Sequence, residues 1–219
     1  MTEIRLTPGY IARHTPVGAG AQGRDAAIVD IAQDLLLRDL HSRTVLDRLA
    51  FKGGTALRKL YAGPAGRFSL DLDFSIAEIG DDPDSILTEV ISLVDGLVLG
   101  PFTYGVAERR GKWSVVYQHS LGGPPVVLTS KLDISPPPWL PVIRRGWTPL
   151  PIHQQYGPPR LPDLHVVQLI ENLAEKISRL NRTTTARHVR PGVGGHQPSH
   201  CWSPGRCLAA TTRCSQDLG

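Results

Sequence analysis

The sequence predicts an α+β protein in which a mixed β-sheet is flanked by helices. Some long segments carry apolar side chains at helical spacing, and shorter segments alternate apolar with polar residues as half-buried strands do. Nine prolines between residues 136 and 162 separate the last predicted strand from the last predicted helix. The 219 residues have room for one domain, or for one domain with a smaller appendage.

In the first fifty residues we expect an irregular arm followed by helices. Residues 8–24 are rich in Gly, Pro and Ala, and we expect an irregular arm there. From Asp25 to Leu49 apolar residues recur at helical spacing, which predicts two helices broken near His41 and Ser42.

The segment Phe68–Ile76 alternates strictly between apolar and polar residues, which predicts a strand. Its five apolar residues fall on one face, and the opposite face carries Ser69, Asp71, Asp73 and Ser75. The apolar face can pack on a core while two carboxylates stand side by side on the other face.

Three further strands are predicted downstream. Residues 102–107 and 113–118 have strand character and are joined by a turn at 109–111. Residues 126–134 form the next predicted strand. Together with the segment before it, this set supplies the predicted sheet.

Two helices and one long loop complete the prediction. Ser85–Leu99 is an amphipathic helix for which Asp84 or Ser85 is a suitable N-cap. The proline content of residues 136–162 is too high for regular structure and predicts a stiffened surface loop. The last predicted helix runs from Asp163 to Leu180.

The carboxylate pair Asp71 and Asp73 is the most informative feature of the chain. Neighbouring anions repel each other and raise each other's pKa unless positive charge lies between them. A hard divalent cation such as Mg2+, bound through oxygen ligands, is a common solution. The segment alone leaves open a second interpretation, an ordinary solvated strand face.

A glycine pair lies just upstream of this strand. Gly53 and Gly54 precede a short helical segment that Thr55 opens. Glycines before a helix let backbone N–H groups approach an anion closely, although most such pairs are simple turns. Combined with the carboxylates, the pair predicts a nucleotide site in which the glycine turn holds the triphosphate and the carboxylates hold the metal.

Two more charged positions are candidates for the same site. Asp133 lies near the end of its strand, and an adjacent antiparallel strand could bring it beside Asp71 and Asp73; Lys131 shares its face and could meet a phosphate. An ordinary ion pair between Lys131 and Asp133 is the alternative.

The last predicted helix carries a further candidate, Lys176. It lies on the flank of a stripe expected to be buried, and Glu171 and Glu175 are expected on the far side. A lysine at such a boundary can extend its stem over the core and present its ammonium to a cleft, although flank lysines are more often structural. The expected stripe comprises Val166, Leu169, Ile170, Leu173, Ile177 and Leu180.

The chain resembles the AbiEii/AbiGii nucleotidyltransferase toxins, which include the mycobacterial MenT toxins. The resemblance is carried by Lys52–Leu57 and Arg67–Phe74, and it returns at Ser130–Ile134 and Glu171–Arg179. It implies a DNA-polymerase-β-like nucleotidyltransferase fold, here with a truncated C-terminal helical part. It also implies a toxin that uses Mg2+ and an NTP to add a nucleotide to RNA, at the 3′ end of the tRNA acceptor stem.

The resemblance assigns roles to individual residues. Asp71 and Asp73 would bind Mg2+, and both would be catalytic. Asp133 would be a third catalytic carboxylate, and Lys176 would contact the phosphates. Ser69 would also be a site of antitoxin control by phosphorylation, which would place roughly −1.5 to −2 charges where a triphosphate sits. The expected nucleotide-binding residues are Lys52, Gly53, Gly54, Thr55, Arg67, Ser69 and Lys131.

The same residues are compatible with two alternatives to active nucleotide transfer. The first is a catalytically inactive remnant of the family that binds nucleotide or antitoxin. The second is a metal-dependent phosphatase or glycosyltransferase using the two aspartates, which fits the Gly53–Thr55 turn poorly.

Composition bounds the cellular setting. A net charge of +4 and a pI near 9.1 are compatible with an RNA partner but are weak evidence for one. There is no apolar run of about 18 residues and no secretory apolar core at the N-terminus, so we expect no membrane partner. All three cysteines lie in the last 19 residues, which suits a reducing compartment. We expect a cytoplasmic monomer with a cognate antitoxin.

The composition changes after Arg187. Residues 188–219 contain no Ile, Lys, Phe or Tyr and hold all the cysteines, without the paired short spacing of a zinc site. Two interpretations fit: a disordered tail, or a reading-frame change that replaced the family's C-terminal helices. We favour the second because the break falls inside a family motif. The expected divisions are a nucleotidyltransferase core with an N-terminal arm at 1–135, a Pro-rich loop at 136–162, a helical segment at 163–187, and the tail.

Overall fold

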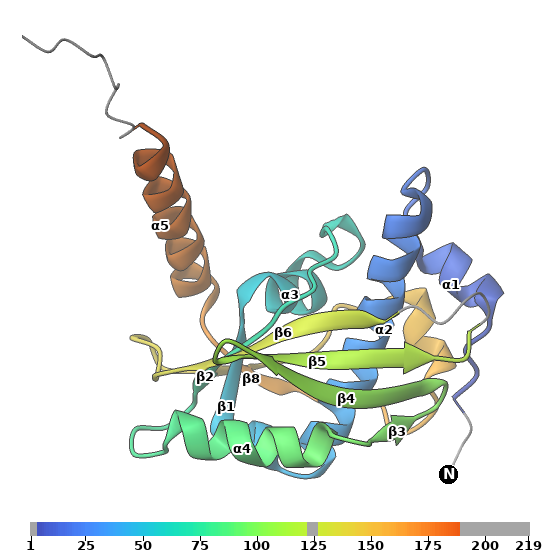
Figure 1. Cartoon of the computed structure of the whole chain (residues 1–219), viewed down its shortest axis with the longest axis horizontal. Coiled ribbons are helices and arrows are strands. Elements are labelled where there is room, and N and C mark those ends of the chain that lie inside the picture. The colour runs from blue at the N-terminus through green and yellow to red at the C-terminus, as the bar shows by residue number, and fades with distance from the viewer. Residues whose placement is uncertain (1–3, 122–126, 189–219) are drawn as a thin grey trace, which may run out of the picture.

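The computed structural model describes residues 4–121 and 127–188, with side chains in the last helix as far as Leu180. Its centre is an eight-stranded sheet with the order β3-β4-β5-β6-β2-β1-β8-β7 (Figure 1). The strands are β1 (Leu49–Lys52), β2 (Leu72–Ile76), β3 (Val98–Leu99), β4 (Phe102–Arg109), β5 (Lys112–His119), β6 (Leu128–Ser135), β7 (Ile143–Arg145) and β8 (Leu164–Val166).

The sheet is mixed, as predicted. β2 runs parallel to β6, and β1 runs parallel to β8. The remaining neighbours, including β1 with β2 and β5 with β6, are antiparallel. The parallel pairing of β2 with β6 corrects the expectation that an antiparallel strand would bring Asp133 towards Asp73.

In the part of the chain that the structure describes, five α-helices accompany the sheet. They are α1 (Pro8–His14), α2 (Gly20–Ser42), α3 (Gly53–Leu57), α4 (Pro83–Val94) and α5 (Leu169–His188). Shorter helical turns are η1 (Val45–Arg48), η2 (Arg58–Ala62), η3 (Gly63–Ala65) and η4 (Pro151–Gln155).

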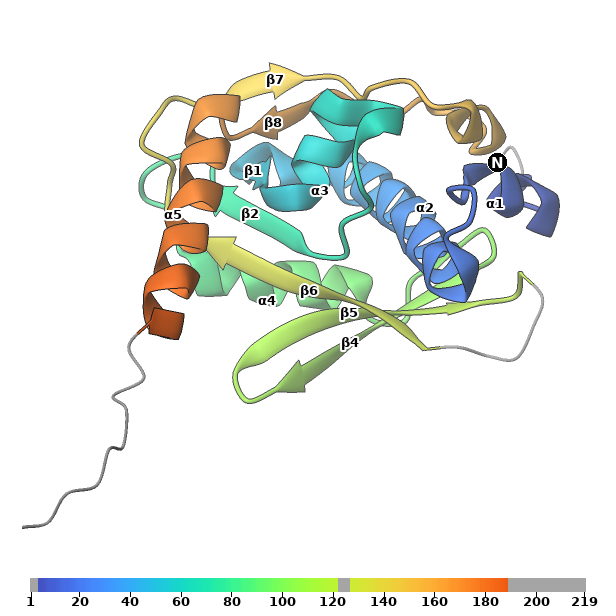
Figure 2. The ribbon, with the colours of Figure 1, turned by 90° about the horizontal axis from the view of Figure 1, so that it is seen from above.

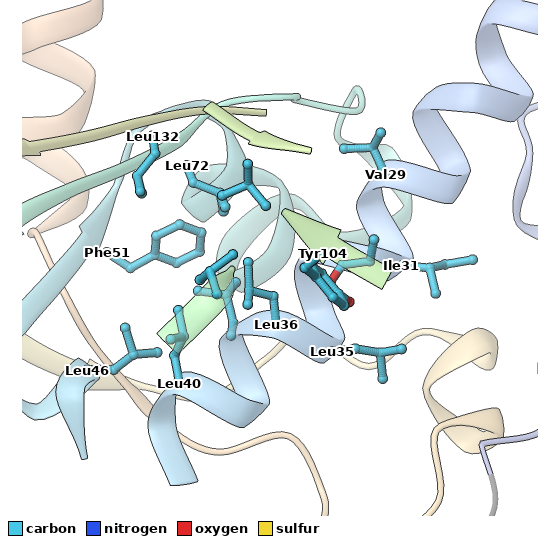
Figure 3. Packing of buried hydrophobic residues seen from close by; sticks show 14 of the residues in the cluster. Val29, Ile31, Leu35, Leu36, Leu40, Leu46, Phe51, Leu72, Tyr104 and Leu132 are labelled. Carbon is cyan, nitrogen blue, oxygen red and sulfur yellow. The ribbon is translucent and has the colours of Figure 1, made fainter. Parts of the chain in front are cut away.

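One face of the sheet is apolar and forms the core with α2 and α4. Cross-strand registers place Phe51, Phe74, Leu132 and Tyr104 on this face, where each is buried. The Tyr104 hydroxyl donates a hydrogen bond to the Ala32 carbonyl of α2 at 2.9 Å. Figure 3 shows the leucines of α2 packing against this layer. The opposite face carries Asp73, which pairs with Lys52 and Asp133 across the strands.

The N-terminal region is more regular than predicted. The expected arm at 8–24 contains α1 and the first turn of α2. The break near His41 and Ser42 is confirmed, but the segment after it is η1 and the start of β1, not a second helix. The apolar residues after Ser42 lie largely in a buried strand. Periodicity alone does not distinguish such a short apolar run from part of a helix.

The predicted helix 85–99 is shorter than expected, because α4 ends at Val94 and β3 follows. Its N-cap is Asp82, whose carboxylate accepts a hydrogen bond from the Ser85 backbone N–H at 3.0 Å. The hairpin of β4 and β5 is confirmed, with its turn at Arg110 and Gly111.

The proline-rich segment contains regular structure, contrary to expectation. β7 and η4 lie within it, and β7 pairs with β8, which occupies the start of the predicted helix 163–180. Prolines flank these short elements and leave their ladder hydrogen bonds intact. The helix α5 therefore begins only at Leu169.

The apolar stripe predicted to be buried on α5 is exposed. Figures 1 and 2 show α5 extending beyond the edge of the sheet, which it contacts near α3. The exposed fraction is 68% for Ile170 and 59% for Ile177. Val166 belongs to β8 instead and is buried. In the described residues, no helix is long and apolar enough to cross a membrane. The expectations for 188–219 concern residues outside the structure's description, apart from His188.

A buried charged cluster supports the segment after α3. Lys59 of η2 donates hydrogen bonds to the Asp30 carboxylate at 2.8 Å and to the Asp34 carboxylate. His14 and Arg58 also contact Asp30, at 2.9 and 3.7 Å. Burial opposes ionisation of Asp30, but Lys59, His14 and Arg58 together hold its pKa below its usual value.

Candidate functional site

The site begins at the junction of β1 and α3, where Gly53 has a φ of +76°. A Cβ at this position would lie 2.2 Å from Oδ2 of Asp73, far inside van der Waals contact. Glycine is therefore required at position 53 for two reasons: the positive φ, and the close approach of the Asp73 carboxylate. The next residue, Gly54, has the same relation to Ser69, because a Cβ there would lie 2.6 Å from the Ser69 Oγ.

The chain that carries Ser69 and Asp71 is held in a way the sequence did not predict. β2 begins only at Leu72, so residues 68–71 are not part of a strand, and Leu70 is 46% exposed. The buried Thr55 hydroxyl donates to the backbone carbonyl of Asp71 and lies 3.4 Å from that of Ser69. Thr55 thus holds the backbone of residues 69–71 in place. Its side chain does not line the cleft described next.

An open cleft of about 360 Å³ lies over this junction. Asp71 and Asp73 both line it, the first exposed and the second buried. Burial, and then the neighbouring Asp71 carboxylate, raise the pKa of Asp73 above its usual value. The cleft is lined by Lys52, Gly53, Gly54, Arg67, Ser69, Asp71, Asp73, Asn172, Glu175, Lys176, Arg179 and Leu180.

Helix α5 supplies the opposite wall. Asn172 accepts a hydrogen bond from the Gly53 N–H at 3.2 Å and donates one to the Gly53 carbonyl at 3.3 Å. One turn further on, Glu175 accepts a hydrogen bond from the Lys52 ammonium at 3.2 Å. Lys176 Nζ lies 3.7 Å from the position of a Cβ on Gly54, so its charge stands at the glycine pair.

Besides Thr55, two predicted residues lie outside the cleft. Asp133 is directly opposite Asp73 across the parallel strands, and Lys131 precedes it on the same face. Their side chains are about half exposed and form an ion pair of 3.6 Å, which is the alternative weighed from the sequence. Within the residues that the structure describes, no three His, Cys, Asp or Glu side chains are grouped to hold a metal ion. Asp133 still acts on Asp73, whose pKa is raised by burial, by Asp71 and, to a smaller degree, by Asp133.

Sequence reasoning missed Leu180 and three polar cleft residues: Asn172, Glu175 and Arg179. The three polar residues lie three and four positions apart, on the polar face of α5 that also carries Lys176. The expectation that Glu175 lies on the far side was wrong, because the apolar stripe is not the face that contacts the body. The polar periodicity 172, 175, 176, 179 was the signal that could have located them.

Comparison with protein families connects this geometry to known proteins. Residues 34–190 match the family described as the nucleotidyl transferase AbiEii toxin of type IV toxin–antitoxin systems. The match spans α3, both aspartates and α5. The chain belongs to this AbiEii family. A comparison with curated proteins found no match.

A solved structure supports the same membership. This AbiEii chain is similar to MenT4, a nucleotidyltransferase toxin from Mycobacterium tuberculosis H37Rv, with a TM-score of 0.69 and 42% sequence identity. The similarity covers 81% of this chain and 60% of MenT4. The mixed sheet flanked by helices is thus a nucleotidyltransferase toxin fold, and the chain spans less than two thirds of the length of MenT4.

Proposed function

We propose that this chain transfers a nucleotide from an NTP to the 3′ end of an RNA, the tRNA acceptor stem, and so blocks translation as the toxin of a toxin–antitoxin pair. The observation that carries the proposal is the convergence of two carboxylates, a glycine pair and Lys176 on one cleft. In the transfer, the RNA 3′ oxygen bonds to the α-phosphorus, the bond to the β-phosphate breaks, pyrophosphate leaves, and the hydroxyl proton passes to water.

The residues present fit a Mg2+ ion. Asp71 and Asp73 offer carboxylate oxygens, the ligands Mg2+ prefers. Burial and then repulsion from Asp71 raise the pKa of Asp73, and a bound cation would offset both. Two carboxylates with bound waters and substrate phosphates are a usual Mg2+ set. When bound, the ion supplies charge stabilisation of the phosphates and of the attacking oxygen.

The remaining side chains bind and orient the substrate. Gly53 and Gly54 leave room for phosphates against the backbone, and Lys176 stands beside them with its positive charge. Arg67 lines the same cleft and can neutralise a further phosphate charge. Lys52 is held by Glu175 at 3.2 Å, so we assign it to fixing the position of α5 as well as to binding nucleotide.

The same cleft suggests how the toxin is controlled. The Ser69 hydroxyl lies at Gly54, so a phosphate on it would occupy the space proposed for the triphosphate. We propose Ser69 as the position at which an antitoxin silences the enzyme. We also propose that the protein is a cytoplasmic monomer.

The test is incubation with labelled NTPs, Mg2+ and total tRNA. Label is expected at tRNA 3′ ends, and Asp71→Ala and Lys176→Ala are each expected to abolish it. Arg5→Ala is a suitable control, because the Arg5 backbone N–H donates a hydrogen bond to the Gln155 carbonyl of η4 and Arg5 does not line the cleft. Labelling that survives both cleft substitutions would refute the proposal.

A second candidate function is nucleotide binding without transfer. It is favoured by α5, which bounds the cleft while its apolar stripe is exposed. Under this alternative the chain binds NTP but labels no RNA, and replacing residues 188–219 with a family-like helical end restores labelling. Labelling by the unaltered chain would exclude it.

A further inference from the structure

A second hollow of about 860 Å³ lies against the cleft. Lys52, Glu175 and Arg179 line both spaces and form the ridge between them. The second hollow differs from the cleft in its walls, which are largely apolar. They include Pro136, Pro137, Pro138, Trp139, Ile170 and Ala174.

Strand β2 leads directly from one space to the other. Asp73 and Ser75, at alternate positions of β2, point to the same face of the sheet. The two aspartates line the cleft and Ser75 lines the second hollow. Successive same-face residues are about 7 Å apart along a strand, so a molecule resting on Ser75 lies one such step from Asp73.

The outer wall of this hollow carries an aromatic side chain, Trp139, whose backbone is held by hydrogen bonds. Trp139 is 95% exposed. Its backbone N–H donates to Glu171 Oε1 at 2.8 Å, and the Leu140 N–H donates to Glu171 Oε2 at 2.9 Å. Gln168 holds the same loop through the Pro141 carbonyl at 2.9 Å. Three prolines precede Trp139, and three hydrogen bonds hold the backbone from Trp139 to Pro141. Because this backbone is held in place, little conformational entropy is lost when a ligand contacts the exposed ring.

The floor of the hollow is polar. Ser75 and Ser135, at the ends of β2 and β6, have their hydroxyl oxygens 3.0 Å apart. Ser135 also donates to the Phe74 carbonyl at 3.1 Å. An aromatic wall above a hydroxyl floor suits a ligand with a flat face and polar edges, which a nucleoside has and an aliphatic protein segment does not.

We infer that the second hollow binds the 3′-terminal nucleoside of a single-stranded RNA end, with its base stacked on Trp139 and its sugar towards Ser75. The inference rests on the proposed function, which requires an acceptor hydroxyl beside Asp71 and Asp73. The triphosphate occupies the glycine side of the cleft, so the acceptor must enter from another side, and β2 opens into this hollow. Trp139 is thereby a positioning residue for the acceptor.

The test is the affinity of the full chain for a short, dye-labelled single-stranded RNA with a free 3′ hydroxyl, measured by fluorescence anisotropy. Trp139→Ala is expected to weaken binding about 5- to 100-fold, the range for losing one base–aromatic stack. Trp139→Phe keeps a ring and is expected to bind within a few-fold of the unaltered chain. NTP affinity is expected to be unchanged in both variants, because Trp139 does not line the nucleotide cleft.

The outcomes separate this inference from the proposed function. Trp139-dependent RNA binding by a chain that transfers nothing supports the inference and refutes the function. Transfer that proceeds with an unchanged KM for RNA in Trp139→Ala overturns the inference and leaves the function standing. The inference is also overturned if the unaltered chain binds no RNA, or if all three chains bind it equally. The hollow would then be a site for a protein partner.

Discussion

Asn172 of α5 and Gly53 of α3 are joined by two hydrogen bonds, one from the Gly53 N–H to the amide oxygen and one from the amide nitrogen to the Gly53 carbonyl. Asn172 is 2% exposed, so this pair is formed away from competing water. The glycine turn and the helix that carries Lys176 are therefore fixed to each other.

Replacing Asn172 is expected to weaken the attachment of α5 to the glycine turn. Asn172→Ala leaves the polar groups of Gly53 without their partner, which costs on the order of 1–3 kcal/mol for a buried group. We expect a lower melting temperature and NTP binding weakened by about tenfold or more. Calorimetric titration measures the binding. Asn172→Asp keeps only the hydrogen-bond acceptor, so its NTP affinity should lie between those of Asn172→Ala and the unaltered chain. If Asn172→Ala binds NTP as tightly as the unaltered chain, Asn172 does not position the site.

Gly53→Ala is expected to abolish nucleotide binding. The new methyl would lie 2.2 Å from the Asp73 carboxylate and would force it out of position. Gly111→Ala is the matched control, because Gly111 has a φ of +71° but nothing within 4 Å of an added Cβ. Both variants bear a backbone strain of about 1–2 kcal/mol, but only the first meets the site. Parallel loss of NTP binding in both would mean that strain alone matters.

The pH dependence of stability provides a separate check on Asp73. Its pKa is raised in the folded state above the ordinary value of 3.8, so the folded protein binds the proton more tightly than the unfolded chain does. Ionised Asp73 is therefore destabilising above both pKa values, and this effect disappears below about pH 4. Without divalent cation, Asp73→Asn should melt higher than the unaltered chain at pH 7, and the difference should vanish as the pH falls.

Asp71→Asn should raise the melting temperature at pH 7 by less than Asp73→Asn does, because Asp71 is exposed and, after burial, is only the second cause of the raised pKa of Asp73. An Asp73→Asn variant that melts lower than the unaltered chain at pH 7 would show that the carboxylate is a stabilising group and would contradict the electrostatic account of the pair.

The buried cluster around Lys59 should dominate stability. Lys59→Met removes the cation between Asp30 and Asp34 and leaves buried carboxylates uncompensated, a loss of about 3–5 kcal/mol in typical buried pairs. Lys131→Met is the control, since its ion pair with Asp133 is exposed and is worth about 1 kcal/mol or less. Urea denaturation measures both. Equal losses in the two variants would contradict the assignment.

Local sequence patterns predicted the cleft better than they predicted the sheet. Gly53, Gly54, Asp71 and Asp73 are close in the chain, so a short turn and one strand bring them together. The positions of Lys131 and Asp133 depend on how β6 pairs with β2, a choice between distant strands that periodicity does not encode.

The helix α5 shows the limits of periodicity in another way. Lys176 was expected at the cleft because the apolar stripe was expected to be buried, and the residue does line the cleft while the stripe is exposed. The contacts of α5 are instead polar, through Asn172 and Glu175. A hydrophobic stripe shows which face avoids water but does not identify what it packs against.

The most direct test of the nucleotide site is isothermal titration of NTP into the full chain, with Mg2+ and after chelation. Asp71 and Asp73 cannot face a triphosphate without a cation, so binding is expected with Mg2+ and is expected to be lost after chelation. Asp71→Asn should bind weakly or not at all under either condition while its melting temperature is nearly unchanged. Equal NTP affinity with and without Mg2+ in the unaltered chain would contradict the metal-dependent site on which this account rests.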